Sequence, residues 1–202
     1  TPVGELLEQE IAEPNELHTM RAMFNSNGLS SNYERATPYK LQDLTEDTTA
    51  APDTLETPPD SLGSNPSEPT GYGNSSWKVL GGGIETSTHD LARFGWNILD
   101  GRIVSDSVRD QRLWSSLTNG LKRWSDTTRN APMVGLAWRV DNTPGRRRAW
   151  HSGSWSGARS LLYIWRDERL IVALMSNRRN HSRQGITTLA NEIADAVRAL
   201  AP

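Results

Sequence analysis

The chain has 202 residues, no cysteine, a formal net charge of −2 and a mean hydropathy of −0.63. This length suffices to bury a hydrophobic core, and the lack of cysteine excludes disulfides, thiol nucleophiles and cysteine-ligated metal sites within these residues. The longest apolar run, Leu170 to Met175, is far shorter than the roughly 20 residues that cross a bilayer, and residues 1–5 carry no signal-peptide pattern. We therefore expect no membrane span, and no targeting segment is visible.

Charge and tryptophan divide the chain into two unlike parts. Residues 1–70 carry 13 acidic and 3 basic side chains, whereas residues 71–202 carry 11 acidic and 19 basic ones. All eight tryptophans lie between Trp77 and Trp165. Two interpretations remain open, because charge counts alone do not separate them: the acidic part is solvated or folds against the basic part, or the basic part holds an anionic ligand.

The acidic part predicts little regular structure beyond its first residues. Residues 4–13 predict a short amphipathic helix with its leucines and isoleucine on one face, which ends at Pro14. Residues 25–76 are rich in Ser, Thr, Asn, Pro and Asp and keep no period of 2 or 3.6. We therefore divide the chain into a helical segment (1–24), a long irregular excursion that would wall a cleft (25–76), and a folded remainder (77–202).

The remainder begins with two predicted helices. Ser87 and Asp90 stand at the N-cap and N3 positions of a capping box, and the helix that follows should end near Gly101. A second helix should begin at Ser105–Asp106. Its expected apolar side consists of Val108, Trp114 and Leu117.

Three predicted strands and a closing helix complete the pattern. The strands cover Met133–Val140, Ser160–Trp165 and Leu170–Ser176, and the last two should form a hairpin around residues 166–169. A helix from about Ser182 has a predicted apolar stripe of Ile186, Leu189, Ile193, Val197 and Leu200. The order indicates an α+β fold, an antiparallel sheet flanked by helices and incomplete in this chain, with one or two further strands to be found.

The segment from Trp150 to Gly157 is the strongest candidate for chemistry. It places a titratable His151 beside two glycines and three serines, between strand candidates. Small residues let a substrate approach the backbone, whose N–H groups can then stabilise an oxyanion.

Five segments in order resemble motifs of the serine β-lactamase-like, or penicillin-binding-protein-like, family. They are residues 4–20, Gly81–Phe94, Val134–Trp138, the His151-Ser152-Gly153 triplet followed by Gly157, and Ser176–Asn177. This family includes class C β-lactamases, D-alanyl-D-alanine carboxypeptidases, esterases and mitochondrial relatives. The resemblance covers residues 4–20 and 77–200, and favours a periplasmic or secreted bacterial location.

The resemblance implies a serine hydrolase that forms an acyl-enzyme and needs no cofactor. His151 takes the place of the lysine in the family's third motif, and the backbone N–H of Ser154 would be an oxyanion donor. Ser152, Gly153 and Trp155 would contact the substrate, a small molecule or a peptide. Because histidine lacks a fixed charge, an esterase or a peptidase is favoured over a true β-lactamase.

The family's Ser-x-x-Lys nucleophile motif and its Tyr-x-Asn motif occur upstream of the segment that residues 4–20 resemble. The sequence spells both motifs only at Tyr72-Gly73-Asn74 and Ser75-Ser76-Trp77-Lys78. Three glycines follow at residues 81–83, whereas the nucleophile needs a helix N-terminus, so we reject Ser75. We expect an N-terminal fragment of the same protein, or an upstream segment, to supply the serine.

Two alternatives remain. A tryptophan- and arginine-rich module could bind carbohydrate or nucleic acid through Trp150, Trp155 and Arg146–Arg148, or the chain could be a non-catalytic homologue of the hydrolase fold. The favoured interpretation involves no nucleic acid. His18, His89 and His181 stand apart from other ligand residues, and we predict no metal site.

Overall fold

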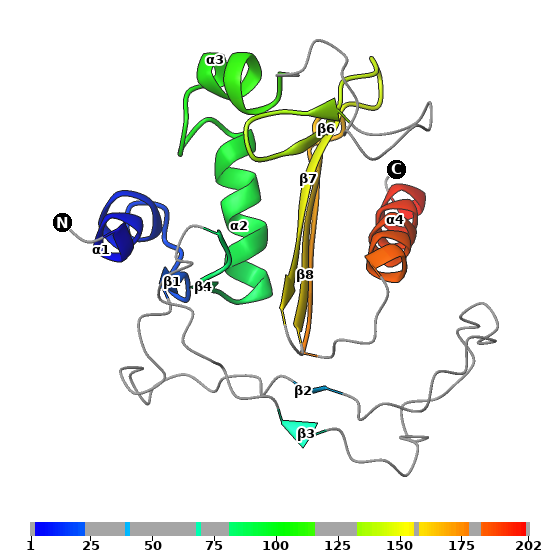
Figure 1. Ribbon diagram of the computed structural model, residues 1–202. Coiled ribbons are helices and arrows are strands. Elements are labelled where there is room, and N and C mark those ends of the chain that lie inside the picture. Colours follow the sequence, from blue (N-terminus) through cyan, green and yellow to red (C-terminus); the bar gives the residue numbers. More distant parts are fainter. Residues whose placement is uncertain are drawn as a thin grey trace.

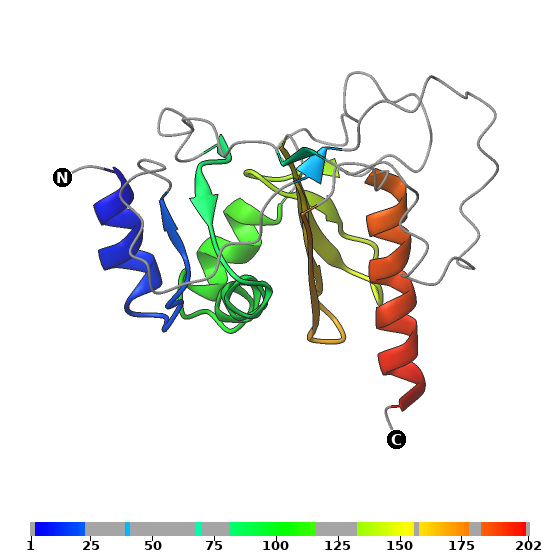
Figure 2. The same ribbon diagram turned by 90° about the horizontal axis from the view of Figure 1, so that it is seen from below.

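The computed structural model describes residues 3–22, 39–40, 68–69, 81–115, 133–155, 158–177 and 183–200. An antiparallel sheet stands between helix α2 (Thr88–Leu99) on one face and helix α4 (Arg183–Leu200) on the other, as Figures 1 and 2 show from two directions. The N-terminal helix α1 (Val3–Leu7) lies on the far side of α2 from the sheet. The predicted α+β fold is thereby confirmed.

The sheet has five strands in sequence order, each antiparallel to the next. They are β5 (Met133–Val134), β6 (Arg139–Asp141), β7 (Arg148–Trp155), β8 (Ala158–Trp165) and β9 (Leu170–Ser176). The β8–β9 hairpin agrees with the prediction, and its register pairs Trp165 with Leu170.

Two strand predictions were wrong. The single strand expected over 133–140 is two strands, β5 and β6, because Ala137 has a φ of +61° and the chain turns back there. The segment around His151, expected between strands, lies within the long strand β7. Glycine and serine depress strand propensity, and pairing with β8 along the whole length of β7 overrides that preference.

The two faces of the sheet carry two separate cores, because alternate side chains of a strand point to opposite faces. On the α2 side, Ala149, Leu162 and Ile164 pack against Ile98 and Leu99. On the α4 side, a residue set from β8 and β9 packs against α4: Leu161, Tyr163, Trp165 and Val172 with Ile186, Ala190 and Ala194. The sheet is therefore covered on both faces.

Helix α4 begins where the sequence indicated, but its predicted buried stripe was wrong. Ile186 is buried and Ile193 packs at the edge of the core, whereas Leu189 and Val197 are each 44% exposed and Leu200 is 84% exposed. The helix is rotated so that Ala190 and Ala194, both fully buried, face the sheet. Small side chains let the helix axis approach the stacked rings of Trp150, Tyr163 and Trp165.

Helix α2 begins at its predicted cap. The Ser87 hydroxyl accepts a hydrogen bond from the Asp90 backbone N–H at 3.1 Å, and the chain leaves the helix through Gly101 at a φ of +74°. The reciprocal half of the capping box is absent at this helix start, because the Asp90 carboxylate binds Thr19 instead.

The second helix is short: α3 (Asp106–Val108) continues into the π-helical turn η3 (Arg109–Leu113). Of its predicted apolar side, Trp114 is buried, Val108 is exposed and Leu117 lies outside the described residues.

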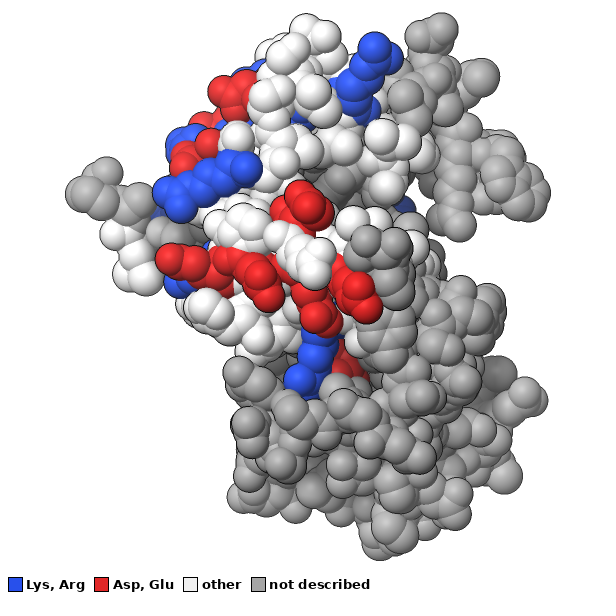
Figure 3. Space-filling view, turned by 90° about the vertical axis from the view of Figure 1, so that its left-hand side faces the viewer, with Lys and Arg blue, Asp and Glu red and all other residues white. Residues whose placement is uncertain are grey.

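The N-terminal segment folds as a small unit against α2. Helix α1 continues into the π-helical turn η1 (Glu8–Ala12), and β1 (Arg21–Ala22) pairs antiparallel with β4 (Ile84–Glu85). Figure 3 shows acidic side chains gathered on the side of the molecule where this unit lies, and the helical part of the unit carries Glu5, Glu8 and Glu10. The expected helix over 4–13 is thus confirmed in place.

A buried carboxylate fastens this unit to α2. Asp90 is 3% exposed, and one of its oxygens accepts hydrogen bonds from the Thr19 backbone N–H at 2.6 Å and the Thr19 hydroxyl at 2.7 Å. Burial raises the pKa of Asp90, but the hydrogen bonds from Thr19 and the neighbouring His89 outweigh it and hold that pKa below its ordinary value of 3.8.

Replacing this carboxylate should loosen the N-terminal unit. We expect Asp90→Asn to lower the free energy of unfolding by about 1–3 kcal/mol at pH 7, because it weakens two charge-assisted hydrogen bonds in a buried site. A depressed pKa stabilises the fold above pH 3.8 and ceases to do so as the pH falls through the folded-state value, so the difference between wild type and variant should shrink in acid. Urea unfolding at several pH values measures it. Glu16→Gln, at an exposed ion pair of the same interface, should change stability by no more than about 0.5 kcal/mol.

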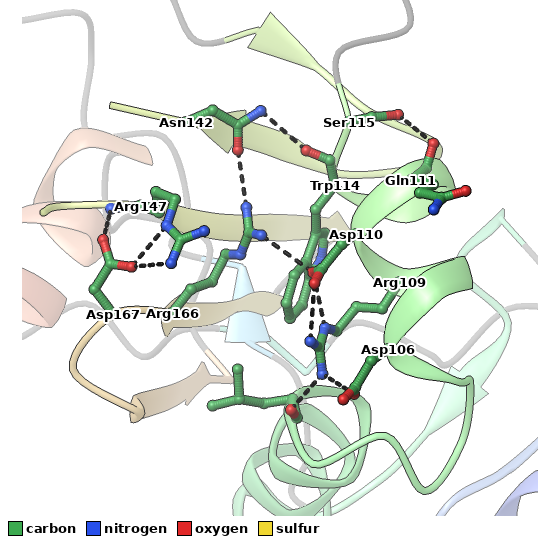
Figure 4. A network of polar contacts seen from close by, with 11 residues as sticks. Asp106, Arg109, Asp110, Gln111, Trp114, Ser115, Asn142, Arg147, Arg166 and Asp167 are labelled. Carbon is green, nitrogen blue, oxygen red and sulfur yellow. Dashed lines mark hydrogen bonds and ion pairs between the residues drawn. The ribbon is translucent and has the colours of Figure 1, made fainter. Parts of the chain in front are cut away.

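A second polar network holds η3 to the sheet (Figure 4). Arg166, whose side chain is 9% exposed, donates to Asn142 at 2.8 Å and to Asp110 at 3.2 Å, and its guanidinium lies 4.6 Å from the ring centre of the buried Trp114. Asn142 donates in turn to the backbone carbonyl of Trp114. Beside them, Arg147 forms an ion pair with Asp167 across the β6–β7 and β8–β9 connections.

The buried arginine of this network should matter far more than an exposed one. We expect Arg166→Met to lower the free energy of unfolding by about 2 kcal/mol, because Asn142 and the Trp114 ring lose their partner. Arg102→Met removes an ion pair at a guanidinium 65% exposed and should cost at most about 0.5 kcal/mol. Equal losses in the two variants by thermal or urea unfolding would contradict this assignment.

The irregular excursion is described at one pairing only, between β2 (Tyr39–Lys40) and β3 (Glu68–Pro69). The rest of 25–76 lies outside the described residues, and the proposed boundaries at 24 and 76 stay predictions. Across the described ranges, no helix has the length and apolar character to cross a membrane.

Candidate active site

Strand β7 is paired on both sides for only part of its length. β6 pairs with Arg148, Ala149 and Trp150, whereas β8 pairs with every residue from Arg148 to Trp155. Among the described strands, residues 151–155 therefore have a neighbour on one side only. On the other side no described strand pairs with this half-strand, and we call this side its open edge. A strand edge of this kind can hydrogen-bond an extended ligand.

The five candidate residues fall on the two faces of this half-strand. His151 and Gly153 lie on the α2 face, in register with Leu162 and Ser160. Ser152 and Ser154 lie on the α4 face, the face of Trp150. Trp155 ends the strand, and its side chain lies outside the described part of the structure, as do Ser156 and Gly157.

The surroundings of His151 disfavour the charged form of its imidazole. The residue is exposed, but nearby protein atoms partly desolvate the ring and the Arg139 guanidinium repels a second positive charge. Both effects hold the pKa of His151 below its ordinary value of 6.5. A neutral imidazole can accept a proton or a hydrogen bond, but it supplies no fixed positive charge.

Gly153 meets a close approach from the Ser160 side chain of the neighbouring strand. A Cβ atom built at this position would lie 2.3 Å from the Ser160 hydroxyl oxygen. The hydroxyl of Ser160 therefore covers the backbone of Gly153 on the face that carries His151. Sequence reasoning missed Ser160, because only the β7–β8 register reveals that it stands opposite the glycine.

This contact predicts a rescue experiment. We expect Gly153→Ala to destabilise the fold by about 1–3 kcal/mol, the usual cost of overpacking. Ser160→Ala removes the obstructing oxygen and leaves a Cβ at an ordinary 3.7 Å, so the double variant should recover most of the loss. Urea unfolding of the four proteins measures the coupling. Additive effects of the two substitutions would contradict the contact.

Sequence reasoning also missed Arg139. This residue begins β6, pairs in register with Trp150, and places its Nη1 3.4 Å from the Ser152 hydroxyl oxygen. Its side chain is half-buried. No sequence signal located it, because its neighbour Ser152 was not recognised as part of a strand.

The Beta-lactamase family model matches residues 1–195. The chain belongs to the Beta-lactamase family. A search of curated proteins finds no match.

Solved structures share the fold at low sequence identity. A D-stereospecific amidohydrolase from Streptomyces sp. has 18% identity and a TM-score of 0.65, over 94% of this chain and 48% of that one. The D-amino acid amidase from Ochrobactrum anthropi SV3, complexed with L-phenylalanine, has 14% identity and a TM-score of 0.71, over 98% and 54%. An octameric penicillin-binding protein homologue from Pyrococcus abyssi has 18% identity and a TM-score of 0.65, over 95% and 37%. This member of the Beta-lactamase family therefore spans about half, or less, of the length of these structures.

Two of the three arginines of the alternative binding module, Arg147 and Arg148, are engaged within the fold. Arg147 forms an ion pair with Asp167 at 2.6 Å, and Arg148 lies 3.5 Å from Asp141 and stacks 5.4 Å from the ring centre of Trp150. Trp150 in turn stacks on Tyr163 at 5.1 Å. Arg146 is exposed, and the Trp155 side chain lies outside the described part of the structure, so the carbohydrate- or nucleic-acid-binding alternative is not tested at these two positions.

Within the described residues, no group of three or more His, Asp or Glu side chains could hold a metal ion. A hollow of about 250 Å³ lies on the N-terminal unit instead, lined by residues 8–21 such as Glu13, His18 and Arg21.

Proposed function

We propose that this chain forms part of a serine hydrolase that cleaves an ester or an amide through an acyl-enzyme. The observation that carries the proposal is the half-paired strand β7, which presents His151, Ser152, Gly153 and Ser154 along an open backbone edge. An extended substrate can pair with such an edge and bring its scissile carbonyl against the strand. Membership of the Beta-lactamase family supports this chemistry.

Each residue of the edge receives a role in the proposal. The Ser154 backbone N–H donates to the oxyanion of the tetrahedral intermediate, together with the N–H of the nucleophile. His151 accepts or relays a proton as a neutral imidazole, since its pKa is depressed. Gly153 keeps the strand close to Ser160, and Ser152 and Trp155 contact the substrate.

The nucleophile itself is assigned to a segment outside residues 1–202. The sequence spells Ser-x-x-Lys only at Ser75–Lys78, shortly before the three glycines at 81–83, and the chain spans about half of the related structures. Strand β9 also supports the idea, because among the described strands it pairs only with β8 and leaves an apolar edge open. We propose that the segment carrying the serine completes the fold, either as the upstream part of the same chain or as a separate fragment.

The substrate class is an ester or an amide rather than a β-lactam. Two of the structural neighbours are named an amidohydrolase and an amidase, which favours amide chemistry here. A β-lactamase motif would provide the fixed positive charge of a lysine at this position. His151, whose pKa is lowered, does not provide it, which argues against β-lactamase activity. A periplasmic or secreted bacterial location remains part of the proposal.

A fluorophosphonate probe tests the nucleophile, because it bonds covalently to activated serines. We expect a co-purifying or upstream peptide with Ser-x-x-Lys to be labelled, and Ser75→Ala to leave labelling unchanged. Intact-mass analysis followed by peptide mapping locates the label. Labelling lost in Ser75→Ala would overturn the external nucleophile, and a completed protein that is never labelled would favour the non-catalytic homologue.

The depressed pKa of His151 predicts the pH profile of hydrolysis. Because the neutral ring is the active form, kcat/KM of the completed protein for p-nitrophenyl acetate should rise with pH along an acidic limb whose midpoint lies below 6.5. His151→Gln should lower kcat/KM about 10²–10⁴-fold and remove that limb. A limb that persists in His151→Gln would assign the titration to another group.

A further inference from the structure

Helix α2 covers only part of the sheet face that carries His151. At Gly95 the helix lies directly over β8, since a Cβ atom built there would lie 3.0 Å from Leu162 Cδ1. Leu162 is accordingly buried, with 5% of its surface exposed. His151, its register partner on β7, is exposed, and Ser160, two residues closer to the start of β8, is half-buried. A ligand can therefore reach this face beside the open edge of β7.

Two polar side chains stand on this accessible part of the face. Alternate residues of a strand share a face, and the β7–β8 register places Ser160 opposite Gly153 and diagonal to His151. The other described residues that the two strands present on this face carry an apolar side chain or none: Ala149, Gly153, Ala158, Leu162 and Ile164. Of the described side chains of β7 and β8, His151 and Ser160 are therefore the polar ones that a ligand on this face can meet.

The hydroxyl of Ser160 leans toward β7. It intrudes on the place that a Cβ atom of Gly153 would take, and so lies above the bare backbone of the half-strand. Within the described ranges this hydroxyl forms no hydrogen bond. A serine hydroxyl has one proton to donate and two lone pairs that accept, so it can bind a donor or an acceptor on a ligand.

The proposed reaction fixes the position of the leaving group. The oxygen of the nucleophile forms a bond to the acyl carbon, and its proton passes to His151. His151 returns that proton to the leaving atom as the bond between this atom and the acyl carbon breaks. The leaving atom must therefore come within hydrogen-bond reach of His151, on the α2 face of β7. Ser160 shares that face and is the diagonal neighbour of His151.

We propose that the Ser160 hydroxyl accepts a hydrogen bond from the N–H of an amide leaving group, and so favours amides over esters. The inference rests on the proposed function and narrows its substrate class. In the tetrahedral intermediate the leaving nitrogen takes the proton from His151 on its lone pair and donates its own N–H to Ser160. The leaving oxygen of an ester has no N–H to donate. Ser160 is therefore a specificity-determining residue.

Two chromogenic substrates test the inference, because they differ only at the leaving atom. p-Nitroacetanilide leaves through an N–H, and p-nitrophenyl acetate leaves through an oxygen. In the protein completed by its upstream segment, we expect Ser160→Ala to lower kcat/KM for the anilide about 3–10-fold, the value of one net hydrogen bond. The same variant should change kcat/KM for the ester by less than about twofold. Absorbance of the released nitroaniline or nitrophenol gives both values.

Matched variants separate a lost hydrogen bond from a disturbed fold. Ser160→Thr keeps a hydroxyl and should keep most of the activity toward the anilide. Thr188→Ala removes a hydroxyl from an exposed position on α4 and should change neither activity. Thermal unfolding of each variant shows whether the fold is kept. N-methyl-p-nitroacetanilide lacks the N–H, so its hydrolysis should not respond to Ser160→Ala, and this comparison carries the test should Ser160→Thr fail to fold.

Equal losses on anilide and ester in Ser160→Ala, or an unchanged rate with the anilide, would overturn the inference. Fluorophosphonate labelling is an independent readout. A labelled protein that shows either of these outcomes rejects the role of Ser160 alone. A completed protein that is neither labelled nor active on either substrate rejects the hydrolase proposal and this inference with it, because no leaving group is then formed for the hydroxyl to bind.

Discussion

The antiparallel pairing of β7 with β8 is the interaction on which the candidate site depends. It runs along all eight residues of β7, while β6 covers only the first three. Full pairing on one side fixes which side chain points to which face, and partial pairing on the other leaves a backbone edge open beside them. A shift of register by one residue would exchange His151 and Gly153 with Ser152 and Ser154, and the Ser160 hydroxyl would no longer cover a glycine.

Several arginines and tryptophans of residues 71–202 contact one another within the fold. Arg109 and Arg166 lie over the ring of Trp114, Arg148 lies over Trp150, and Arg198 lies over Trp165 while it pairs with Glu168. Each of these guanidinium groups also has a carboxylate partner in the described residues. The positive charge of these four arginines is therefore balanced locally by the carboxylates of Asp110, Asp141 and Glu168.

Local patterns in the sequence predicted the helices, the β8–β9 hairpin and the cap at Ser87, because each depends on residues close in the chain. Features set by distant partners were missed. Asp90 was expected to cap its own helix but binds Thr19, 71 residues away in sequence. α4 turns its alanines rather than Leu189 and Val197 toward the sheet, because the stacked aromatic rings leave little space. At the site, the motif indicated His151 to Ser154, while Ser160 and Arg139 required the register of two neighbouring strands.

The apolar edge of β9 has a consequence for the behaviour of the isolated chain. Residues 170–176 contain no charged residue and no proline, the gatekeepers that usually prevent one sheet edge from adding to another. With β8 as the only partner among the described strands, and with Leu189, Val197 and Leu200 of α4 partly exposed, such a chain should form sheet-to-sheet aggregates when it is concentrated or refolded alone. A complementary strand bound to that edge would block this aggregation. An increase in solubility would therefore show that the missing segment has bound, even before hydrolysis is measured.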